Sequence, residues 1–182
     1  NAFSGIFDGA GHTITVPEGG LPLFGYVRNT RIRNLNIYGK KIAGYGLVNN
    51  FEGVGLSGSA VEIDNVTLKS GSSTLKSGLL GANKTVNGYA GCSAAFVATI
   101  TNCTIEKGVV VGYDKKQSQI GAIAGRMQGT IKNCVSYADV YGTDYVGGII
   151  GTRDNAMGTC EVIGSEFYGT VTASGQLYRR RG

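Results

Sequence analysis

The sequence predicts an all-β protein folded as a parallel β-helix, a solenoid of about six coils, from three observations. One phrase of apolar residues around an Asn recurs along the chain at near-regular intervals. A shorter phrase bounded by Gly recurs out of phase with it. Of the 182 residues 31 are Gly and only 2 are Pro, which fits many short strands separated by turns. No stretch has the sustained 3.6-residue period of a helix.

The first phrase supplies one strand per repeat. The leading residues of its last five copies are separated by 31, 37, 31 and 31 residues, which indicates stacked units with one insertion. Together with the opening strand, these copies place the coils near Ile14, Ile32, Ile63, Ile100, Ile131 and Val162.

An Asn follows two residues after the start of each strong copy. If Ile32 points inward, strict alternation would turn Leu35 outward, and a bend at Asn34 removes this conflict. Asn tolerates left-handed backbone, and its amide can bond to local backbone or to a neighbouring copy. We therefore expect a structural ladder of stacked side chains formed by Asn34, Asn65, Asn102 and Asn133.

The next inward column contains Cys103 and Cys134 as neighbours. We expect buried free thiols that pack as small hydrophobic groups, because in-register stacking rarely offers the dihedral angle of a disulfide. A disulfide between them is the alternative.

The second phrase supplies a further short strand per repeat. Its pieces are only three to six residues long and Gly-bounded, as expected for strands. It covers residues 22–25, 46–49, 78–81, 122–125 and 148–151, with Asn49 in place of the closing Gly of the second copy.

Two other repeat architectures fit less well. A propeller with Trp-Asp signatures would need Trp, and the chain has none. Leucine-rich repeats share the start of the phrase at Ile32, but their required Asn or Cys farther along is replaced by Lys40, Gly71, Gly108 and Asp139.

The domain organisation follows from the repeats. We interpret residues 1–2 as a remnant of cloning, 3–178 as one β-helix domain and 179–182 as a cut end or linker. The repeats are lengthened by insertions at 82–97 and 109–119. Binding residues gather on such projecting loops, which makes these the candidates for contacting a partner: Tyr89, Phe96, Tyr113, Lys115 and Lys116. The alternative is that both loops only cover the side of the solenoid.

Charge and composition argue against several functions. The net charge is +5, and Arg179, Arg180 and Arg181 supply three of these charges, so we expect no nucleic-acid partner. No apolar run reaches the ~18 residues of a membrane span, so no membrane insertion is expected. With one His and no Cys-x-x-Cys pair, we expect neither a metal site nor a cofactor.

An enzyme of this fold acting on polysaccharides would need clustered carboxylates. Asp64 is the single acidic residue at the position before the ladder Asn, where other copies carry Arg33, Thr101 and Lys132. No catalytic residue is therefore assigned.

Residues 78–81, Gly-Leu-Leu-Gly, and 148–151, Gly-Ile-Ile-Gly, together with the Asn phrase, resemble the GLUG-motif repeats of bacterial surface and secreted proteins. Residues 3–14 also resemble the entry strand of pectin-lyase-like β-helices. The resemblance covers about residues 3–172 and implies a right-handed β-helix. It also implies a stalk or display domain in a larger protein, among adhesins and IgA-cleaving metallopeptidases.

We therefore expect a non-catalytic adhesion or display domain, extracellular or on a bacterial cell surface. Its partner would be a host or matrix glycan or protein. A polysaccharide lyase or hydrolase and a pure spacer are the alternatives. Since both ends of a β-helix expose strand edges, we expect flanking domains to cap them or copies to associate end to end.

Overall fold

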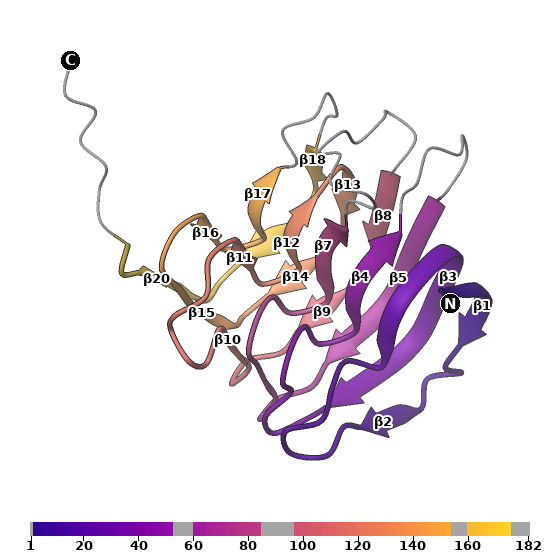
Figure 1. Cartoon of the computed structure of the whole chain (residues 1–182), viewed down its shortest axis with the longest axis horizontal. Coiled ribbons are helices and arrows are strands. Elements are labelled where there is room, and N and C mark those ends of the chain that lie inside the picture. The colour runs from indigo at the N-terminus through magenta and orange to yellow at the C-terminus, as the bar shows by residue number, and fades with distance from the viewer. Residues whose placement is uncertain (1, 53–59, 85–96, 154–159, 176–182) are drawn as a thin grey trace.

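The computed structural model describes residues 2–52, 60–84, 97–153 and 160–175. These residues form 20 strands and no helix, which confirms the all-β prediction. All pairs between these strands are parallel (Figure 1). In the part of the chain that is described, there is no helix long and apolar enough to cross a membrane.

The first, Asn-containing phrase forms strands that run from the middle of a 14-stranded sheet to one of its edges. Each strand pairs with its equivalent in the next repeat, so strands far apart in sequence lie side by side (Figure 1). In spatial order they are β1 (Phe3–Asp8), β3 (Phe24–Tyr38), β5 (Ala60–Leu68), β8 (Val97–Thr101), β13 (Gly129–Lys132) and β18 (Cys160–Ile163).

Shorter strands continue each repeat. In β3 and β5 the strand continues through the Asn bend. In the other repeats a separate short strand follows the bend or turn, and these strands are β2 (Thr13–Thr15), β9 (Thr104–Ile105), β14 (Val135–Ser136) and β19 (Glu166–Phe167). A separate four-stranded sheet contains β6 (Ser73–Thr74), β10 (Val110–Val111), β15 (Asp139–Gly142) and β20 (Thr170–Ala173).

The second, Gly-bounded phrase leads into another series of strands, which joins the large sheet through the first part of β3. Its members are β4 (Val48–Glu52), β7 (Leu80–Lys84), β12 (Ala124–Met127) and β17 (Ile150–Arg153). The remaining two strands, β11 (Ile120–Gly121) and β16 (Val146–Gly147), pair with each other.

The register follows the sequence repeat. Ile32 lies opposite Ile63, Ile63 opposite Ile100, Ile100 opposite Ile131, and Ile131 opposite Val162. The pairing across the 37-residue interval has the same alignment as the pairings across intervals of 31. The six additional residues of that interval therefore do not shift the register between β5 and β8.

The alternation of buried and partly exposed side chains on either side of Asn34 agrees with the predicted pattern. Ile32, Leu35 and Ile37 are buried, while Arg33 and Asn36 are partly exposed. Burying each such aliphatic side chain contributes about 1.5–3 kcal/mol. Because a slip of one residue would move every one of these side chains to the outer face, the core specifies the register.

The inward column that begins at Ile32 and ends at Val162 is buried only in repeats that have a further repeat stacked on their C-terminal side. Ile32, Ile63, Ile100 and Ile131 are fully buried, but Val162 is 45% exposed. Within the described residues no strand pairs with the outer edge of β18. Ile163, Tyr168 and Val171 are exposed at the same end, so the predicted inward position of Val162 lies uncovered.

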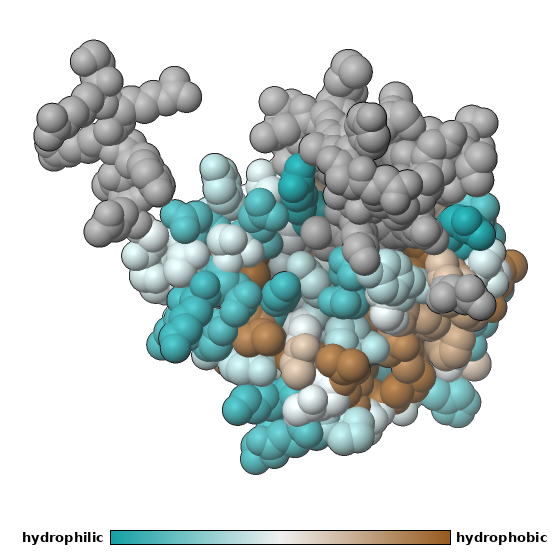
Figure 2. Space-filling model, viewed as in Figure 1, coloured by the Kyte–Doolittle hydropathy of each residue, from teal (hydrophilic) through white to brown (hydrophobic). Residues whose placement is uncertain are grey.

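The N-terminal end is also open. Phe3, Ile6 and Leu21 are exposed there. On the face shown in Figure 2, hydrophobic surface lies mainly towards the N-terminal end and hydrophilic surface towards the C-terminal end. Both ends of the strand stack therefore present apolar side chains to solvent.

Cys103 and Cys134 are buried free thiols in adjacent repeats. The N–H of Cys103 donates to Cys134 Sγ at 3.4 Å, and the N–H of Cys134 donates to Ser165 Oγ at 3.1 Å. The Cys134 thiol and the Ser165 hydroxyl thus each accept a hydrogen bond from the backbone of the preceding repeat. Burial raises the pKa of the Cys103 thiol, which keeps it protonated.

Two glycines of the second phrase allow backbones of successive repeats to approach closely. A Cβ on Gly46 would lie 1.9 Å from the Gly78 carbonyl oxygen, and a Cβ on Gly78 would lie 1.8 Å from the Ala122 carbonyl oxygen. These contacts are far shorter than van der Waals separation, so only Gly fits without moving the backbone.

We expect Gly78→Ala to destabilise the protein by about 1–3 kcal/mol, because the added methyl group must displace backbone. Gly25→Ala is the matched control, since a Cβ there meets nothing within 4 Å. That control should be neutral or slightly stabilising. Urea denaturation of both variants measures the difference, and equal midpoints would contradict the packing argument.

We expect Cys103 and Cys134 to resist iodoacetamide in the native protein and to react fully once the chain is unfolded in urea. Their burial and the raised pKa of Cys103 both disfavour an accessible thiolate. Peptide mapping by mass spectrometry reads out each thiol separately. Rapid native labelling of either thiol would show that this column opens to solvent.

Candidate functional site

A polar pocket of about 370 Å³ lies on the outer surface beside the second series of strands. Its volume falls at the lower end of the range of roughly 300–1,000 Å³ common for small-molecule sites. The described residues that line it are Tyr45, Asn49, Asn50, Lys76, Gln117, Ser118, Gln119 and Arg126.

Closing glycines of the second phrase make room for the aromatic ring of the pocket. A Cβ on Gly81 would lie 2.9 Å from Tyr45 Cε2, and a Cβ on Gly125 would lie 3.5 Å from Tyr45 Cε1. Tyr45 is therefore 8% exposed, and burial raises the pKa of its hydroxyl. The Gly-bounded phrase, which lets the strands approach closely, thus also leaves the space that the Tyr45 ring occupies.

Two strands contribute polar side chains to the lining. On β12, Arg126 is partly exposed, whereas Ala124, Gly125 and Met127 are buried. On β4, Asn50 directly follows the last residue of the 46–49 copy and lines the same pocket. In the register, Ala82 of β7 lies between Asn50 and Arg126.

The rim segment, residues 112–119, is held in place by hydrogen bonds. The N–H groups of Gly112 and Tyr113 both donate to the Thr74 carbonyl oxygen, at 2.9 and 3.1 Å. Gln117 Nε2 donates to Asp114 Oδ2 at 2.7 Å, and the N–H of Gln119 donates to the Asp144 carbonyl oxygen at 2.9 Å. The rim is thus fixed to the strands on both sides before any ligand arrives.

The described lining carries two cations, Lys76 and Arg126, and no carboxylate. Lys76 Nζ lies 5.4 Å from the centroid of the Tyr45 ring, a cation–π distance. Asn49, Asn50 and the Gln side chains supply amides that can both donate and accept hydrogen bonds. This combination suits a small ligand rich in hydroxyl groups.

Of the five predicted partner-contacting residues, the structure describes Tyr113, Lys115 and Lys116. Tyr89 and Phe96 fall outside the described residues. Tyr113 lies beneath Lys41, with 5.4 Å from Nζ to the ring centroid, and Lys115 Nζ lies 4.7 Å from the centroid of Tyr141.

Lys116 is exposed, and its N–H donates to Asp114 Oδ1 at 3.0 Å. The structure brings none of the three described candidates into the pocket lining. The predicted insertion 109–119 does reach the site through Gln117, Ser118 and Gln119.

Sequence reasoning missed Tyr45, Lys76 and Arg126. Asn49 was visible only as a departure from the closing Gly of the repeat. Lys76 lies two residues before the Gly78 copy and Arg126 directly after the 122–125 copy, so positions flanking the phrase were the available signal.

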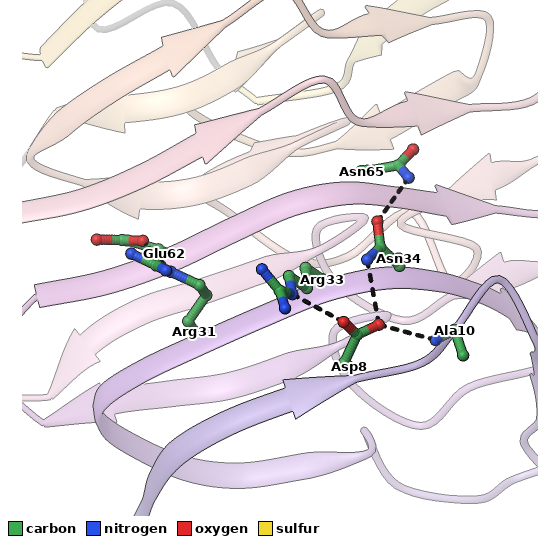
Figure 3. Close-up of polar contacts among 7 residues, drawn as sticks. All are labelled: Asp8, Ala10, Arg31, Arg33, Asn34, Glu62 and Asn65. Atoms are coloured by element: carbon green, nitrogen blue, oxygen red, sulfur yellow. Dashed lines mark hydrogen bonds and ion pairs between the residues drawn. The ribbon is translucent and has the colours of Figure 1, made fainter.

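A second pocket of about 350 Å³ lies near the N-terminal end, between β1, β3 and β5. Its lining contains the ion pair between Arg31 Nε and Glu62 Oε2 at 2.5 Å (Figure 3). Since these two charges neutralise each other, this pocket offers less to a charged or polar ligand than the first.

The four ladder residues share one backbone conformation. Asn34, Asn65, Asn102 and Asn133 have φ values of 53°, 51°, 54° and 53°, and Gly164 in the last copy has 55°. These values lie in the left-handed region, which Asn and Gly adopt more readily than other residues. The bend is therefore a property of the Asn position in each repeat.

The amides stack at the N-terminal end. Asn65 Nδ2 donates to Asn34 Oδ1 at 2.9 Å, and Asn34 Nδ2 donates to Asp8 Oδ1 at 3.1 Å (Figure 3). The N–H of Ala10, Asn34 and Arg33 together lower the pKa of Asp8 below its ordinary value, in that order of importance. The ionised carboxylate of Asp8 is thus the terminal hydrogen-bond acceptor of the row formed by Asn65 and Asn34.

The row is interrupted at the next repeat. Asn102 Nδ2 donates to Asp64 Oδ1 at 2.7 Å, where a continuous ladder would use Asn65. Thr101 Oγ1 donates to the same carboxylate oxygen at 2.6 Å. A carboxylate is a stronger acceptor than an amide oxygen, which explains the change of partner.

At position 65 we expect Gly to be tolerated better than Ala by about 1 kcal/mol, because Ala must adopt the left-handed conformation. Asn36 is the control: its Nδ2 also donates to a neighbouring repeat, at 2.8 Å to the Gly11 carbonyl oxygen, but it lies in a regular strand. There the order should reverse, with Asn36→Ala more stable than Asn36→Gly. Urea denaturation of the four variants decides, and the same order at both positions would contradict the strain argument.

Within the described residues, no three His, Cys, Asp or Glu side chains are grouped so that they could hold a metal ion. The chain matches no protein-family model, no curated protein and no solved structure.

Proposed function

We propose that this chain is a right-handed parallel β-helix that serves as a non-catalytic adhesion or display domain of a larger secreted bacterial protein. Its partner would be a glycan, bound on the outer wall of the solenoid at the polar pocket. The domain would act outside the cell or on its surface.

The strand pairing supports the β-helix. Equivalent strands pair in parallel at intervals close to the sequence repeat, and each repeat contributes to more than one sheet. A chain that advances by one strand spacing per repeat in several sheets describes successive coils. The right hand of the coils is taken from the resemblance to GLUG-motif and pectin-lyase-like repeats.

The pocket is the observation that carries the binding role. Its lining contains the buried ring of Tyr45, several amide side chains and two cations, and hydrogen bonds hold the rim segment in place. The pocket lies on the side of the strand stack, away from its two ends. Sugars present alternating hydroxyl groups and C–H faces, and amide side chains can match the hydroxyl groups as donors or acceptors. A preformed polar site of this kind favours binding over a purely spacing role.

We expect the chain to be retained by at least one member of an immobilised panel of host, matrix and plant glycans, without release of fragments. Asn50→Ala should weaken this retention about 3–10-fold, the loss of one net hydrogen bond. Thr67→Ala, an outward substitution on β5 away from the pocket, should leave it unchanged. Retained protein and released fragments are measured together by mass spectrometry.

The other outcomes separate the alternatives. Released fragments would identify a polysaccharide lyase or hydrolase. No retention and no fragments across the panel would leave a spacer. Retention that Asn50→Ala and Thr67→Ala affect equally would move the binding site away from the pocket.

A further inference from the structure

The rim segment, residues 112–119, supplies three of the side chains that line the polar pocket: Gln117, Ser118 and Gln119. Its start is hydrogen-bonded to the Thr74 carbonyl oxygen of the preceding repeat. Towards its end, the Gln117 carbonyl oxygen accepts the N–H of Thr143 from the following repeat at 2.8 Å. Other contacts must hold the middle of the segment between these two attachments.

Two cation–π pairs meet the middle of the rim segment. Lys41 Nζ lies 5.4 Å from the centroid of the Tyr113 ring, and Lys115 Nζ lies 4.7 Å from the centroid of the Tyr141 ring. Both distances fall within the ~6 Å of a cation–π contact. Each pair joins the rim segment to a residue of another repeat.

The strand register places the two pairs on opposite sides of the segment. One buried column fixes the order of the repeats, each residue pairing with the next: Ile42, Thr74, Val111 and Val140. Lys41 directly precedes the first residue of this column, and Tyr141 directly follows the last. Tyr113 is therefore contacted from the N-terminal side of its repeat, and Lys115 from the C-terminal side.

The backbone of the rim segment needs such support. Lys115 and Gln119 have φ values of 60° and 57°, in the left-handed region that residues with a side chain rarely adopt. Strained residues of this kind persist where the surrounding structure holds them. The pair formed by Lys115 contacts one of these two residues directly.

The pair at Tyr113 also affects a side chain of the lining. Asp114 directly follows Tyr113, and its Oδ2 accepts Gln117 Nε2 at 2.7 Å. A shift of Tyr113 would therefore move the carboxylate that orients Gln117. Because a rim that is ordered in advance loses less entropy on binding, such a shift would weaken the affinity of the pocket.

We propose that the two cation–π pairs, Lys41 with Tyr113 and Lys115 with Tyr141, hold the rim segment in the geometry that binds the glycan. The four residues are then positioning residues of the pocket. This proposal rests on the proposed function. It gives Tyr113 and Lys115, which the sequence predicts as partner contacts, a role that acts through the side chains at the end of the segment.

Native-state hydrogen exchange of the full chain, followed by NMR, tests the hold on the rim without any ligand. Tyr113→Leu and Lys115→Gln should each speed the exchange of the Gln119 and Thr143 N–H groups about two- to five-fold, the strength of one exposed cation–π contact. Tyr113→Phe and Lys115→Arg should keep the original rates, because they retain the ring and the cation. Lys40→Gln, an equal loss of charge at an exposed position, is the control and should change neither rate.

Tyr141→Leu removes one pair from outside the rim segment and should match Lys115→Gln. The double variant should exchange no faster than either single variant, because one contact can be lost only once. Additive effects would show that the two residues act independently and would overturn the pairing. Urea midpoints close to that of the unmodified chain show that each variant is folded.

The immobilised panel of host, matrix and plant glycans tests the consequence for binding. Tyr113→Leu and Lys115→Gln should weaken retention about two- to five-fold. Tyr113→Phe, Lys115→Arg and Lys40→Gln should be retained like the unmodified chain.

Faster exchange together with weaker retention supports the proposal. Unchanged exchange would overturn it, and weaker retention with unchanged exchange would point to direct contact of Tyr113 and Lys115 with the glycan. Faster exchange with unchanged retention would also overturn it, because binding would then not depend on the order of the rim. An empty panel would reject the proposed function, and the exchange rates separate that failure from a failure of the two pairs to hold the rim.

Discussion

Parallel hydrogen bonding between equivalent strands of successive repeats constrains the whole molecule. It requires the same side-chain direction at the same place in each repeat, and the stack of Ile32, Ile63, Ile100 and Ile131 meets that requirement with fully buried side chains. The left-handed Asn two residues after each of these Ile residues corrects the phase of the alternation, so that the segment beyond it also points its apolar residues inward. Backbone bonding, apolar burial and the Asn bend therefore depend on one another, and a change of register would lose all three together.

The same constraint shapes the surface. Strands can pair along the second phrase because Gly46 and Gly78 let the backbones approach, and Gly81 and Gly125 leave a space that the Tyr45 ring fills. Around that ring, Asn49 and Asn50 of β4 and Arg126 of β12 are only partly buried, so these positions can carry polar side chains. The rim segment, residues 112–119, then closes one side of the pocket and is hydrogen-bonded to the carbonyl oxygens of Thr74 and Asp144. The shape of the pocket thus depends on close backbone packing at the glycines. Its polar side chains occupy positions whose residue type this packing does not determine.

This division explains what the sequence could predict. Strand positions, register and the conformation of the four Asn residues repeat along the chain, so they are visible in a single sequence. Partners of individual side chains do not repeat: Asp64 accepts the amide of Asn102 through a contact offset by one residue, and nothing in the spacing of the phrase indicates it. The pocket was also hidden, since Tyr45, Lys76 and Arg126 belong to separate segments and have no counterparts of the same type one repeat away. The sequence did indicate the segment 109–119, because an insertion is visible as a break in the period, but it favoured the charged and aromatic residues at its centre over the Gln residues at its end.

The uncovered end of the stack at Val162 bears on how such a protein can change in length. Each repeat is covered by the following one through equivalent columns, so gain or loss of one whole repeat would alter the length of the stack by one strand spacing, about 4.8 Å, and would preserve the interior. The pocket would keep its shape as long as the repeats that contain β4, β7 and β12 remained adjacent. The length of the stack and the geometry of the pocket are therefore separable properties of this architecture, and evolution could adjust the first without altering the proposed binding site.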